Sequence, residues 1–560
     1  MSVTQERSAP SREQDTRTSR FLPWLAAVIP TSLVILLILL THPRRLYTSD
    51  ATAQQSIVRT WYDVGHSLTY VPRDTWALKV PLYLVIELFS LPPNDKLLIA
   101  ILVLNVLTFL MLGWAVWRLV AGTTAGARWY EATVPLTWLA VVGGGISSNR
   151  MMPNYRNIEL GFTFVMLALI AGYLGELRTR EAGAEGRFGV NRRVVVLGLV
   201  SAVLIGVLGF DDPYIALLVA GPLIPATLGW YWLRRRDPRF LHVAAVMIAS
   251  FLVTSGLRTV AGWAGVRFDD TVPSLALGPS DLRLHLSLLL PSTNLQLGTD
   301  RWDRDPQDLL AQVLVIVVAV TMLLVTAALA AHGWRRKKFV VTFIALHWPL
   351  VLAGFLVSWH TQDRSAGRYL VLAVFDLVVA TAVLLPELRA RRRALSVALI
   401  GLLSVGAVVS LGTGMATAID VNSRPYAPVV HQQAMVQAVE RAIDEHGAVK
   451  GYAPFWSANI TSYMVGRKST AVEIICRNGR LTTRQWLSDT ARLERPAQAV
   501  FLVWDPTVLG PDGCTAARRD AQLGPPIATY PLTSPPQPTP GGGVVSVLVY
   551  APDIKNRLLP

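Results

Sequence analysis

The sequence has 560 residues, of which 52% are apolar and only 16% are charged, and its formal net charge is +15. This balance excludes an ordinary soluble enzyme and is typical of a polytopic membrane protein that carries some soluble mass. It does not indicate a nucleic acid partner, because membrane proteins concentrate Lys and Arg in their cytoplasmic loops.

The chain begins with a polar tail over 1–20 that holds four arginines, and it continues into an apolar run over 21–41. The run is as long as a transmembrane helix and lacks a small-residue cleavage site, so we expect a retained signal anchor. Ten more runs are long enough to span, near 97–118, 130–147, 158–176, 195–212, 213–233, 241–263, 309–331, 339–359, 367–386 and 396–413. The sequence therefore predicts a mostly α membrane protein with about 11 transmembrane helices.

A further apolar stretch over 76–91 is short and is interrupted by Lys79, Pro81 and Glu87. If this stretch is an interfacial helix, every basic loop falls on the same side as the N-terminal tail, which the Lys and Arg bias then places in the cytoplasm. Only seven of the 52 basic residues are Lys, a skew that GC-rich codon usage produces, for example, in an actinobacterium. We expect a multi-pass protein of a bacterial inner (plasma) membrane with a cytoplasmic N-terminus.

The outer side of the predicted transmembrane domain, 21–413, has two long loops, at 42–96 and 264–308. The first contains the interfacial helix, and the second contains another short amphipathic stretch, DLRLHLSLLLP, over 281–291. Most carboxylates of the domain fall in outer loops by this topology. Any chemistry is therefore expected to face outward.

The remaining residues, 414–560, are predicted to form a small extracytoplasmic α/β domain. A helical pattern near its start ends at Gly447, a residue suited to terminate a helix. Apolar runs in KGYAPFW, TAVEIIC, AVFLVWD and VVSVLVYA predict strands, and LTTRQWLSDTARLE predicts a helix between two of them. The only two cysteines, Cys476 and Cys514, lie in this domain. An oxidising compartment allows a disulfide between them, and two unpaired buried thiols are the alternative.

Asp50 follows the first apolar run directly, in the stretch LYTSDATAQQ, and Asp63 and His66 lie further along the same loop. His66 is a candidate for binding the sugar or the acceptor. A carboxylate at the membrane face, sheltered by an interfacial helix, suits a general base. The alternative is a solvated aspartate that marks the end of a helix.

Two other outer segments offer groups that bind hydroxyls. Asp211 and Asp212, in GFDDPYIA, form either an ordinary turn before proline or a pair that faces the same cavity as Asp50 and holds an acceptor hydroxyl or a metal. Arg156, Asn157 and Glu159 end the polar stretch SSNRMMPNYRNIEL. Such side chains bind sugars, although an ordinary polar turn explains them nearly as well.

Arginines near the outer leaflet could bind phosphate. Arg258 lies near the outer end of its span, and Arg364 and Arg368 lie in WHTQDRSAGRY. A guanidinium binds phosphate in a bidentate manner, whereas snorkelling to lipid headgroups is the alternative. Asp376 lies inside the next span, and we expect it to face another helix, paired for example with an arginine.

This layout resembles the GT-C superfamily of membrane glycosyltransferases. The matching features are an acidic residue after the first span in YTSDA, a long first outer loop with an interfacial helix, and about eleven spans. The acidic hairpin GFDDP, the arginine turn DRSAGRYL and a trailing outer α/β domain also match. The resemblance covers the whole architecture, but none of the motifs is specific to a donor or an acceptor.

The resemblance implies a polyprenyl-phosphate sugar donor, whose sugar passes with inversion to an acceptor hydroxyl of an envelope glycan, lipid or protein. Asp50 matches the general base position, although it is flanked by Ser49 and Ala51 and not by a second acid, which leaves Asp63 as a substitute. The turn with Arg364 and Arg368 matches the place where the lipid phosphate binds. No cofactor is firmly implied, and a divalent metal stays open.

Two other functions remain in competition with the transferase. A transporter or flippase of a lipid-linked glycan also needs many spans, but such proteins generally show internal repeats, and the sequence has no duplicated halves. A non-catalytic envelope scaffold with the same architecture is the third hypothesis.

Overall fold

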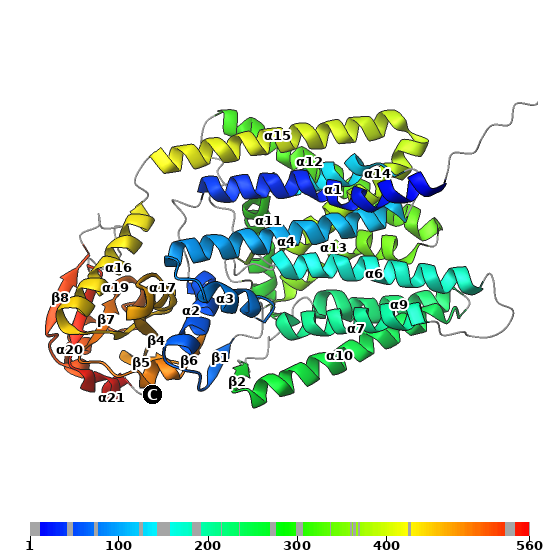
Figure 1. Ribbon diagram of the computed structural model, residues 1–560. Helices are drawn as coiled ribbons and strands as arrows, with labels where there is room; N and C mark the ends of the chain where they lie inside the picture. The colour runs from blue at the N-terminus through cyan, green and yellow to red at the C-terminus, as the bar shows by residue number, and fades with distance from the viewer. Residues whose placement is uncertain are drawn as a thin grey trace, which may run out of the picture.

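The computed structural model describes most of the chain. Its described residues are 12–41, 49–71, 77–122, 127–142, 157–181, 192–213, 216–234, 236–268, 276–297, 306–336, 338–358, 361, 366–367, 370–423, 427–532 and 544–558. The fold is mostly helical, with a sheet near the C-terminus (Figure 1).

Each of the eleven apolar runs contains a helix in the described part of the chain. These helices are α1 (Arg12–Thr41), α4 (Pro93–Ala121), α5 (Trp129–Val141), α6 (Asn157–Glu181), α7 (Arg192–Asp211), α9 (Gly221–Leu233), α10 (Arg239–Trp263), α12 (Pro306–Arg336), α13 (Phe339–Val357), α14 (Val371–Arg391) and α15 (Arg393–Ser423). A π-helical turn, η3 (Ala216–Ala220), leads into α9. Six of the described helices are long and apolar enough to cross a membrane. The structure is therefore that of a multi-pass membrane protein.

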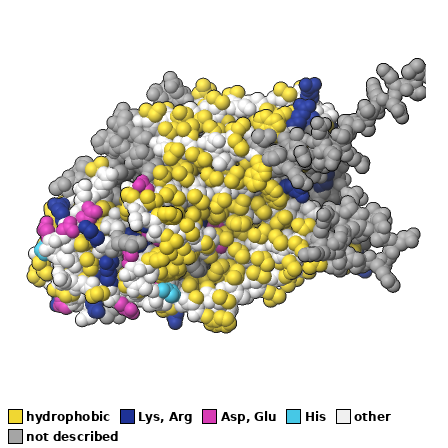
Figure 2. Space-filling model, viewed as in Figure 1, with side chains coloured by type: hydrophobic (Ala, Val, Ile, Leu, Met, Phe, Trp, Pro, Cys, Tyr) yellow, Lys and Arg dark blue, Asp and Glu magenta, His cyan; other side chains and the backbone are white. Residues whose placement is uncertain are grey.

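The helices run side by side in one bundle (Figure 1). Among the six helices that are long and apolar enough to cross a membrane, α14 is the most enclosed, because 89% of its most apolar stretch is buried. A hydrophobic surface covers the middle of the bundle, and charged side chains gather beyond it (Figure 2). The C-terminal sheet lies at one end of the bundle, called here the domain end, and the basic termini of α4, α12 and α14 point to the opposite end. The fold thus separates a domain end from a basic end.

Three shorter helices lie at the domain end: α2 (Ser49–Asp63), α3 (Val80–Glu87) and α11 (Pro279–Leu297). The helix α3 falls inside the stretch predicted to be interfacial, and Pro81 stands in its first turn, where proline is tolerated. The sequence analysis did not predict α2. It forms because Ala and Gln favour helix, and because residues 52–60 are buried on every side by neighbouring segments. Asp50 therefore lies in a helix and not in a loop.

The C-terminal domain contains a six-stranded sheet in the order β5-β4-β3-β7-β9-β8. Its strands are β3 (Lys450–Pro454), β4 (Thr470–Arg477), β5 (Arg480–Arg484), β7 (Val500–Trp504), β8 (Ala528–Pro531) and β9 (Ser546–Tyr550). The strands β4, β3 and β7 are parallel, and the other pairs are antiparallel. The helices and turns of the domain are α16 (Ala427–His446), α17 (Phe455–Met464), η5 (Gly466–Lys468), α18 (Ala491–Glu494), α19 (Pro506–Leu509), α20 (Ala516–Leu523), η6 (Pro552–Ile554) and α21 (Lys555–Leu558). The predicted α/β composition is confirmed.

One local prediction in this domain was wrong, and two elements end at other residues than the apolar runs suggested. The stretch LTTRQWLSDTARLE is not one helix, because Asn478 and Gly479, both with positive φ, turn the chain back so that its first residues pair as β5 with β4. Only its last four residues, α18, are helical. The strand predicted in KGYAPFW stops at Pro454, and the next two residues begin α17. The helix α15 continues to Ser423, past the predicted end of the transmembrane domain at 413.

A disulfide joins Cys476, in β4, to Cys514, in the loop before α20. The Cα atoms are 5.9 Å apart, and 38 positions separate the two residues in the sequence. Closing a loop of this length removes unfolded-state entropy worth about 4 kcal/mol. The bond therefore contributes to the stability of the C-terminal domain.

A second, three-stranded sheet connects segments that are far apart in the sequence. The strand β1 (Thr69–Val71), from the first long loop, pairs in parallel with β2 (Val266–Phe268), which follows α10. On its other edge β1 pairs with β6 (Ser488–Asp489) of the C-terminal domain. This small sheet ties two loops of the bundle to the domain beside them.

Candidate functional site

Three ionisable side chains are buried together at the domain end of α6 and α7. Lys79, in the turn before α3, places its Nζ 2.8 Å from Oε1 of Glu159, in the first turn of α6. Asp211, at the end of α7, interacts electrostatically with both and accepts a hydrogen bond from the Leu78 amide at 2.9 Å. All three side chains are fully buried. The structure thus brings two predicted sugar-binding residues, Glu159 and Asp211, into one ionic cluster.

This ionic cluster holds two carboxylates against one ammonium. A buried excess of negative charge is costly, so the cluster favours a bound proton or a hydrogen-bond donor. Tyr83 of α3 lies nearby, where burial and then the carboxylates of Glu159 and Asp211 raise the pKa of its hydroxyl. The tyrosine therefore stays protonated. The cluster has the groups needed to hold a hydroxyl or to exchange a proton.

Arg59 fixes α2 against the C-terminal domain. Its guanidinium donates to the backbone carbonyls of Ser462 and Tyr463, at the end of α17, and lies 5.4 Å from the centre of the Tyr463 ring. The Tyr463 hydroxyl donates to Glu87 Oε1 at 3.0 Å, and Glu87 is paired with Lys96 at 2.6 Å. The first long loop, α4 and the domain are thus connected through buried polar contacts.

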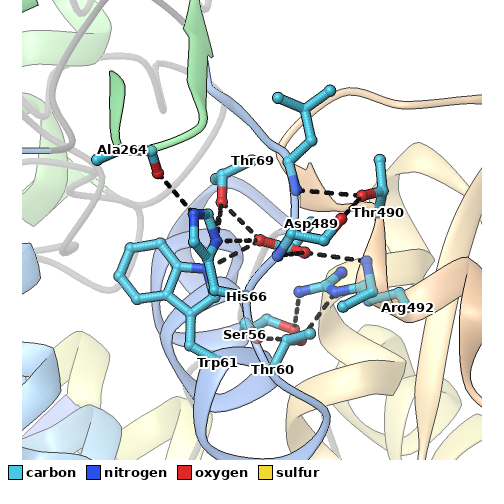
Figure 3. Close-up of polar contacts among 12 residues, drawn as sticks. Ser56, Thr60, Trp61, His66, Thr69, Ala264, Asp489, Thr490 and Arg492 are labelled. Atoms are coloured by element: carbon cyan, nitrogen blue, oxygen red, sulfur yellow. Dashed lines mark hydrogen bonds and ion pairs between the residues drawn. The ribbon is translucent and has the colours of Figure 1, made fainter. Parts of the chain in front are cut away.

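Arg492 joins the same two parts from the domain side and is 1% exposed. It donates to Ser56 Oγ at 2.6 Å and to Thr60 Oγ1 at 3.0 Å, both on α2 (Figure 3). It also donates to Asn459 Oδ1 of α17 at 2.9 Å. Burial, followed by the nearby charge of Arg59, lowers the pKa of Arg492 to about 9. The position of α2 therefore depends on a buried guanidinium that is held by neutral oxygens.

His66 makes a second connection between the loops and the domain (Figure 3). Its Nδ1 lies 2.8 Å from Asp489 Oδ2, and its Nε2 lies 2.7 Å from the carbonyl oxygen of Ala264, which follows α10. Both partners are oxygen atoms that can accept a hydrogen bond. The sequence analysis predicted His66 to bind sugar or acceptor. In the structure its two nitrogens already contact groups of the protein.

Asp489 is buried at the centre of this connection. Burial by itself raises the pKa of its carboxyl, but hydrogen bonds from the Thr69 hydroxyl, the Ala491 amide, His66 and the Ser67 amide lower it below the ordinary value. The group therefore remains an anion at neutral pH. It anchors the middle of the first long loop to the C-terminal domain.

We expect Arg492→Ala to lower the free energy of unfolding by about 2–4 kcal/mol, because it leaves several buried oxygens without a donor. Thermal unfolding of the detergent-purified chain measures the change. Arg480→Ala is the matched control, since Arg480 is exposed on β5, and it should change stability by less than about 0.5 kcal/mol. Equal stability of the two variants would show that Arg492 does not hold α2 in place.

A separate buried carboxylate, Glu473, lies in β4 and is 3% exposed. Burial raises the pKa of its carboxyl to about 7, against the opposing effect of Arg484, whose Nη1 lies 3.4 Å from Glu473 Oε1. Its Oε2 atom has no hydrogen-bond partner in the described structure. The folded domain therefore binds a proton at Glu473 more tightly than the unfolded chain does.

Glu473→Gln is expected to stabilise the domain at alkaline pH. A raised pKa means that the folded state is most favoured below the unfolded value of 4.5 and loses stability as the pH rises towards about 7. Above pH 8 the buried carboxylate therefore lowers the free energy of unfolding of the wild type by up to about 3 kcal/mol. The uncharged amide of the variant avoids this loss. Unfolding curves recorded at pH 5 and pH 8.5 test this. A variant no more stable than wild type at pH 8.5 would contradict the assignment.

The structure places three other predicted residues in separate surroundings. Asp63 lies 3.6 Å from Nε of Arg59, one turn earlier on α2. Asp212 is fully buried beside Asp211. The Arg258 guanidinium lies 5.6 Å from the centre of the Phe268 ring in β2. Their predicted roles as substitute base, acceptor-binding group and phosphate-binding group stay predictions.

Several other predicted residues fall outside the described part. Asp50 lies in the first turn of α2 and Asn157 begins α6, but the side chains of both are outside the description. Arg156, Arg364 and Arg368 are outside the described residues altogether. Their predicted roles are therefore untested.

Asp376 is fully buried in α14 and, as expected, faces another helix. Its partner is a histidine and not an arginine: His347 of α13, whose Nδ1 lies 2.8 Å from Asp376 Oδ2. The other histidine nitrogen lies 2.6 Å from the carbonyl oxygen of Leu218, in the π-helical turn η3. A π turn leaves carbonyls available for such contacts.

Sequence reasoning missed the role of Lys79, which it treated only as an interruption of an apolar stretch. A Lys and a Glu inside such a stretch are themselves a signal, because buried charges are costly unless they are paired. Asp489 and Arg492 were missed because the segment around them was predicted to be one helix. Within the described ranges, no group of three or more His, Cys, Asp and Glu side chains could hold a metal ion.

A scan of the sequence against protein-family models found no match, and a comparison with curated protein sequences found no relative. Comparison with solved structures found an oligosaccharyltransferase of Archaeoglobus fulgidus tethered to an acceptor peptide, with 11% identity and a TM-score of 0.48 over 84% of this chain. The chain spans 64% of the length of that protein.

The same comparison found ArnT of Cupriavidus metallidurans. The apo structure has 12% identity and a TM-score of 0.49, over 96% of this chain and 99% of that one. The structure bound to undecaprenyl phosphate has 10% identity and a TM-score of 0.47, over 94% and 98%. All of these TM-scores lie below 0.5, and the proposal below rests on the residues of this chain.

Proposed function

We propose that the protein is an inverting glycosyltransferase that moves a sugar from a polyprenyl-phosphate donor to an extracytoplasmic acceptor hydroxyl. Asp50 is the general base, and arginines near the membrane surface, Arg258, Arg364 and Arg368, bind the lipid phosphate. The observation that carries the proposal is the placement of α2. This helix follows α1 at the domain end, has Asp50 in its first turn, and is held there by buried arginines.

The chemistry explains why that placement matters. A polyprenyl phosphate cannot leave the bilayer, so the enzyme must meet its phosphate at headgroup depth. Inverting transfer needs one base for the attacking hydroxyl and cations for the leaving phosphate. The first turn of a helix favours a negative charge, so the backbone of α2 keeps a carboxylate there ionised, which is the form a general base needs. A fixed helix also keeps that carboxylate in one position relative to the donor.

The orientation follows from the separation of the two ends of the bundle. The basic end is proposed to face the cytoplasm and the domain end to face outward. The disulfide in the C-terminal domain supports this orientation, because disulfides persist in oxidising compartments. A lipid-linked donor and an envelope glycan, lipid or protein acceptor would then meet at the domain end.

A reporter fused after Arg118, at the basic end of α4, is expected to report the cytoplasm. The reason is that Arg118 lies in the last turn of α4, and α4 ends at the end of the bundle opposite the C-terminal domain. Alkaline phosphatase and green fluorescent protein fusions at this position measure the sidedness, and a fusion at residue 532 serves as the opposite control. Phosphatase activity from the fusion after Arg118 would overturn the orientation.

The experiment that tests the activity uses the purified chain in lipid nanodiscs with a sugar-labelled polyprenyl phosphate. Transfer releases free polyprenyl phosphate and moves the label to a water-soluble acceptor. If the protein is folded and the donor remains intact with every sugar and acceptor tested, the result would count against a transferase.

One observation favours a second candidate, a transporter of a lipid-linked glycan. The pair His347–Asp376 is buried inside the bundle and contacts the irregular turn η3, and intramembrane charges next to irregular helices are typical of transport pathways. The two functions differ at Asp50. A transferase needs this carboxylate as a base, whereas a transporter whose path crosses the bundle does not.

A further inference from the structure

An aromatic cluster lies where β3 passes into α17 in the C-terminal domain. The rings of Phe455 and Trp456 are 4.9 Å apart, and those of Phe455 and Trp486 are 4.8 Å apart. The guanidinium of Arg484 lies 4.6 Å from the centre of the Trp486 ring and contacts Glu473. Three aromatic rings, a cation and a carboxylate thus form one continuous set of contacts, called here the aromatic cluster.

The cluster combines an exposed apolar surface with buried polar atoms that lack partners. Trp456 is 53% exposed although it is among the largest apolar side chains. Glu473 Oε2 and Trp486 Nε1 are buried and have no hydrogen-bond partner in the described structure. Buried polar atoms in folded proteins are nearly always paired, so each of these atoms needs an explanation. A ligand with several hydroxyls would supply the missing partners.

The cluster also lies near the proposed base. Arg59 of α2 contacts Tyr463, near the end of α17, and Arg492 links Ser56 of α2 to Asn459 of α17. In both contacts the residue of α17 lies nearly the same number of positions after its partner in α2. Later residues of α2 therefore lie beside later residues of α17, and the two helices run parallel. Their first turns therefore lie at the same end. The first turn of α17 carries the aromatic cluster, and the first turn of α2 carries the proposed base.

We propose that the aromatic cluster binds the carbohydrate acceptor, a binding site that rests on the proposed function of the whole chain. A pyranose or furanose ring has an apolar C–H face and a polar rim of hydroxyls. The apolar face packs on Trp456 and Phe455, and the hydroxyls donate to Glu473 and accept from Arg484 and the Trp486 indole. Binding there would hold a glycan beside the first turn of α2, where the attacking hydroxyl is needed.

The chemistry of the cluster favours a carbohydrate over a lipid surface. An acyl chain would pack on the exposed tryptophan, but it would supply no hydrogen-bond donor for Glu473. A buried carboxylate oxygen without a partner is suited to a ligand whose hydroxyl groups can donate hydrogen bonds inside an apolar site. Insertion of Trp456 into the membrane is therefore the competing outcome of the test.

The test measures saccharide binding to the full chain in nanodiscs by saturation-transfer NMR. The probes are methyl glycosides and di- to tetrasaccharides of mannose, galactose, glucose and arabinofuranose. Wild type is expected to bind at least one of these. Trp456→Ala and Glu473→Gln are expected to weaken that binding about ten-fold each, the loss expected from one packing or hydrogen-bonding contact. Ile527→Ala, which removes another exposed apolar side chain of the same domain, should leave binding unchanged.

Two results would overturn the proposal. One is a wild-type chain that binds none of the probes. The other is unchanged saccharide binding in Trp456→Ala and Glu473→Gln. If Trp456→Ala also lost binding to lipid vesicles, Trp456 would be assigned to the membrane. Saccharide binding is measured without donor and without transfer. An Asp50→Asn chain that binds saccharide normally but transfers nothing therefore supports this site, and a chain that binds saccharide but never transfers contradicts only the proposed function.

Discussion

Asp50→Asn protein is expected to lose sugar transfer by about 10²–10⁴-fold while its abundance in the membrane stays unchanged. The amide has the same shape as the carboxylate but cannot accept the proton of the attacking hydroxyl. Its position in the first turn of α2 leaves the fold of that helix intact, since Asn and Asp are both accepted near a helix start. Transfer of label from a polyprenyl-phosphate sugar, normalised to protein, measures the effect.

Asp95→Asn is the matched control for this variant. Asp95 is an exposed residue in the first turn of α4, also at the domain end. It has the same charge as Asp50 and the same place in its helix, but it lies outside the proposed site. Its activity should equal that of wild type. Full activity of Asp50→Asn would remove Asp50 from the mechanism. If Asp63→Asn lost activity instead, the role of base would move to Asp63.

Lys79→Met is expected to destabilise the protein by about 3–5 kcal/mol, the largest stability effect that the structure predicts. Methionine fills the space of the lysine stem but leaves Glu159 and Asp211 buried without their cation. One or both carboxyls must then take up a proton. Thermal aggregation of the detergent-purified protein measures the loss, and the deficit should shrink as the pH is lowered, because protonation removes the unpaired charges.

Two further variants separate this effect from a simple loss of packing. Adding Glu159→Gln to Lys79→Met should recover much of the stability, because the unpaired charge is reduced. Lys468→Met is the surface control, since Lys468 and its partner Asp444 are both 67% exposed, and it should change stability by less than about 0.5 kcal/mol. A Lys79→Met protein as stable as this control would show that the ionic cluster is not required for the fold.

Helix positions in the bundle could be predicted from the sequence because apolar runs of membrane length have few alternatives. The helix α2 could not, because its first half is polar and its burial comes from segments distant in the chain. The same reason applies to β1, β2 and β6. These strands are two or three residues long and exist through pairing with one another. A local pattern carries no information about such partners.

The candidate site was only partly predictable. Asp50, Glu159 and Asp211 were found because carboxylates beside predicted spans are conspicuous. That Lys79 joins two of them depends on how α3 packs against α6 and α7, which no spacing in the sequence encodes. Arg484 and Trp486 were hidden inside a segment predicted to be helical. The Asn-Gly pair at 478–479 was the overlooked signal, because it predicts a hairpin and would have placed Arg484 on a strand and Trp486 just after it.

The most direct measurement of the central claim is lipid and glycan profiling of a strain from which the gene is deleted. If the chain transfers a sugar from a polyprenyl-phosphate donor, that lipid-linked donor should accumulate and an envelope glycan should lack the sugar. A wild-type copy should restore both, and an Asp50→Asn copy at equal abundance should restore neither. Unchanged donor levels and an intact glycan in the deletion strain would contradict the claim.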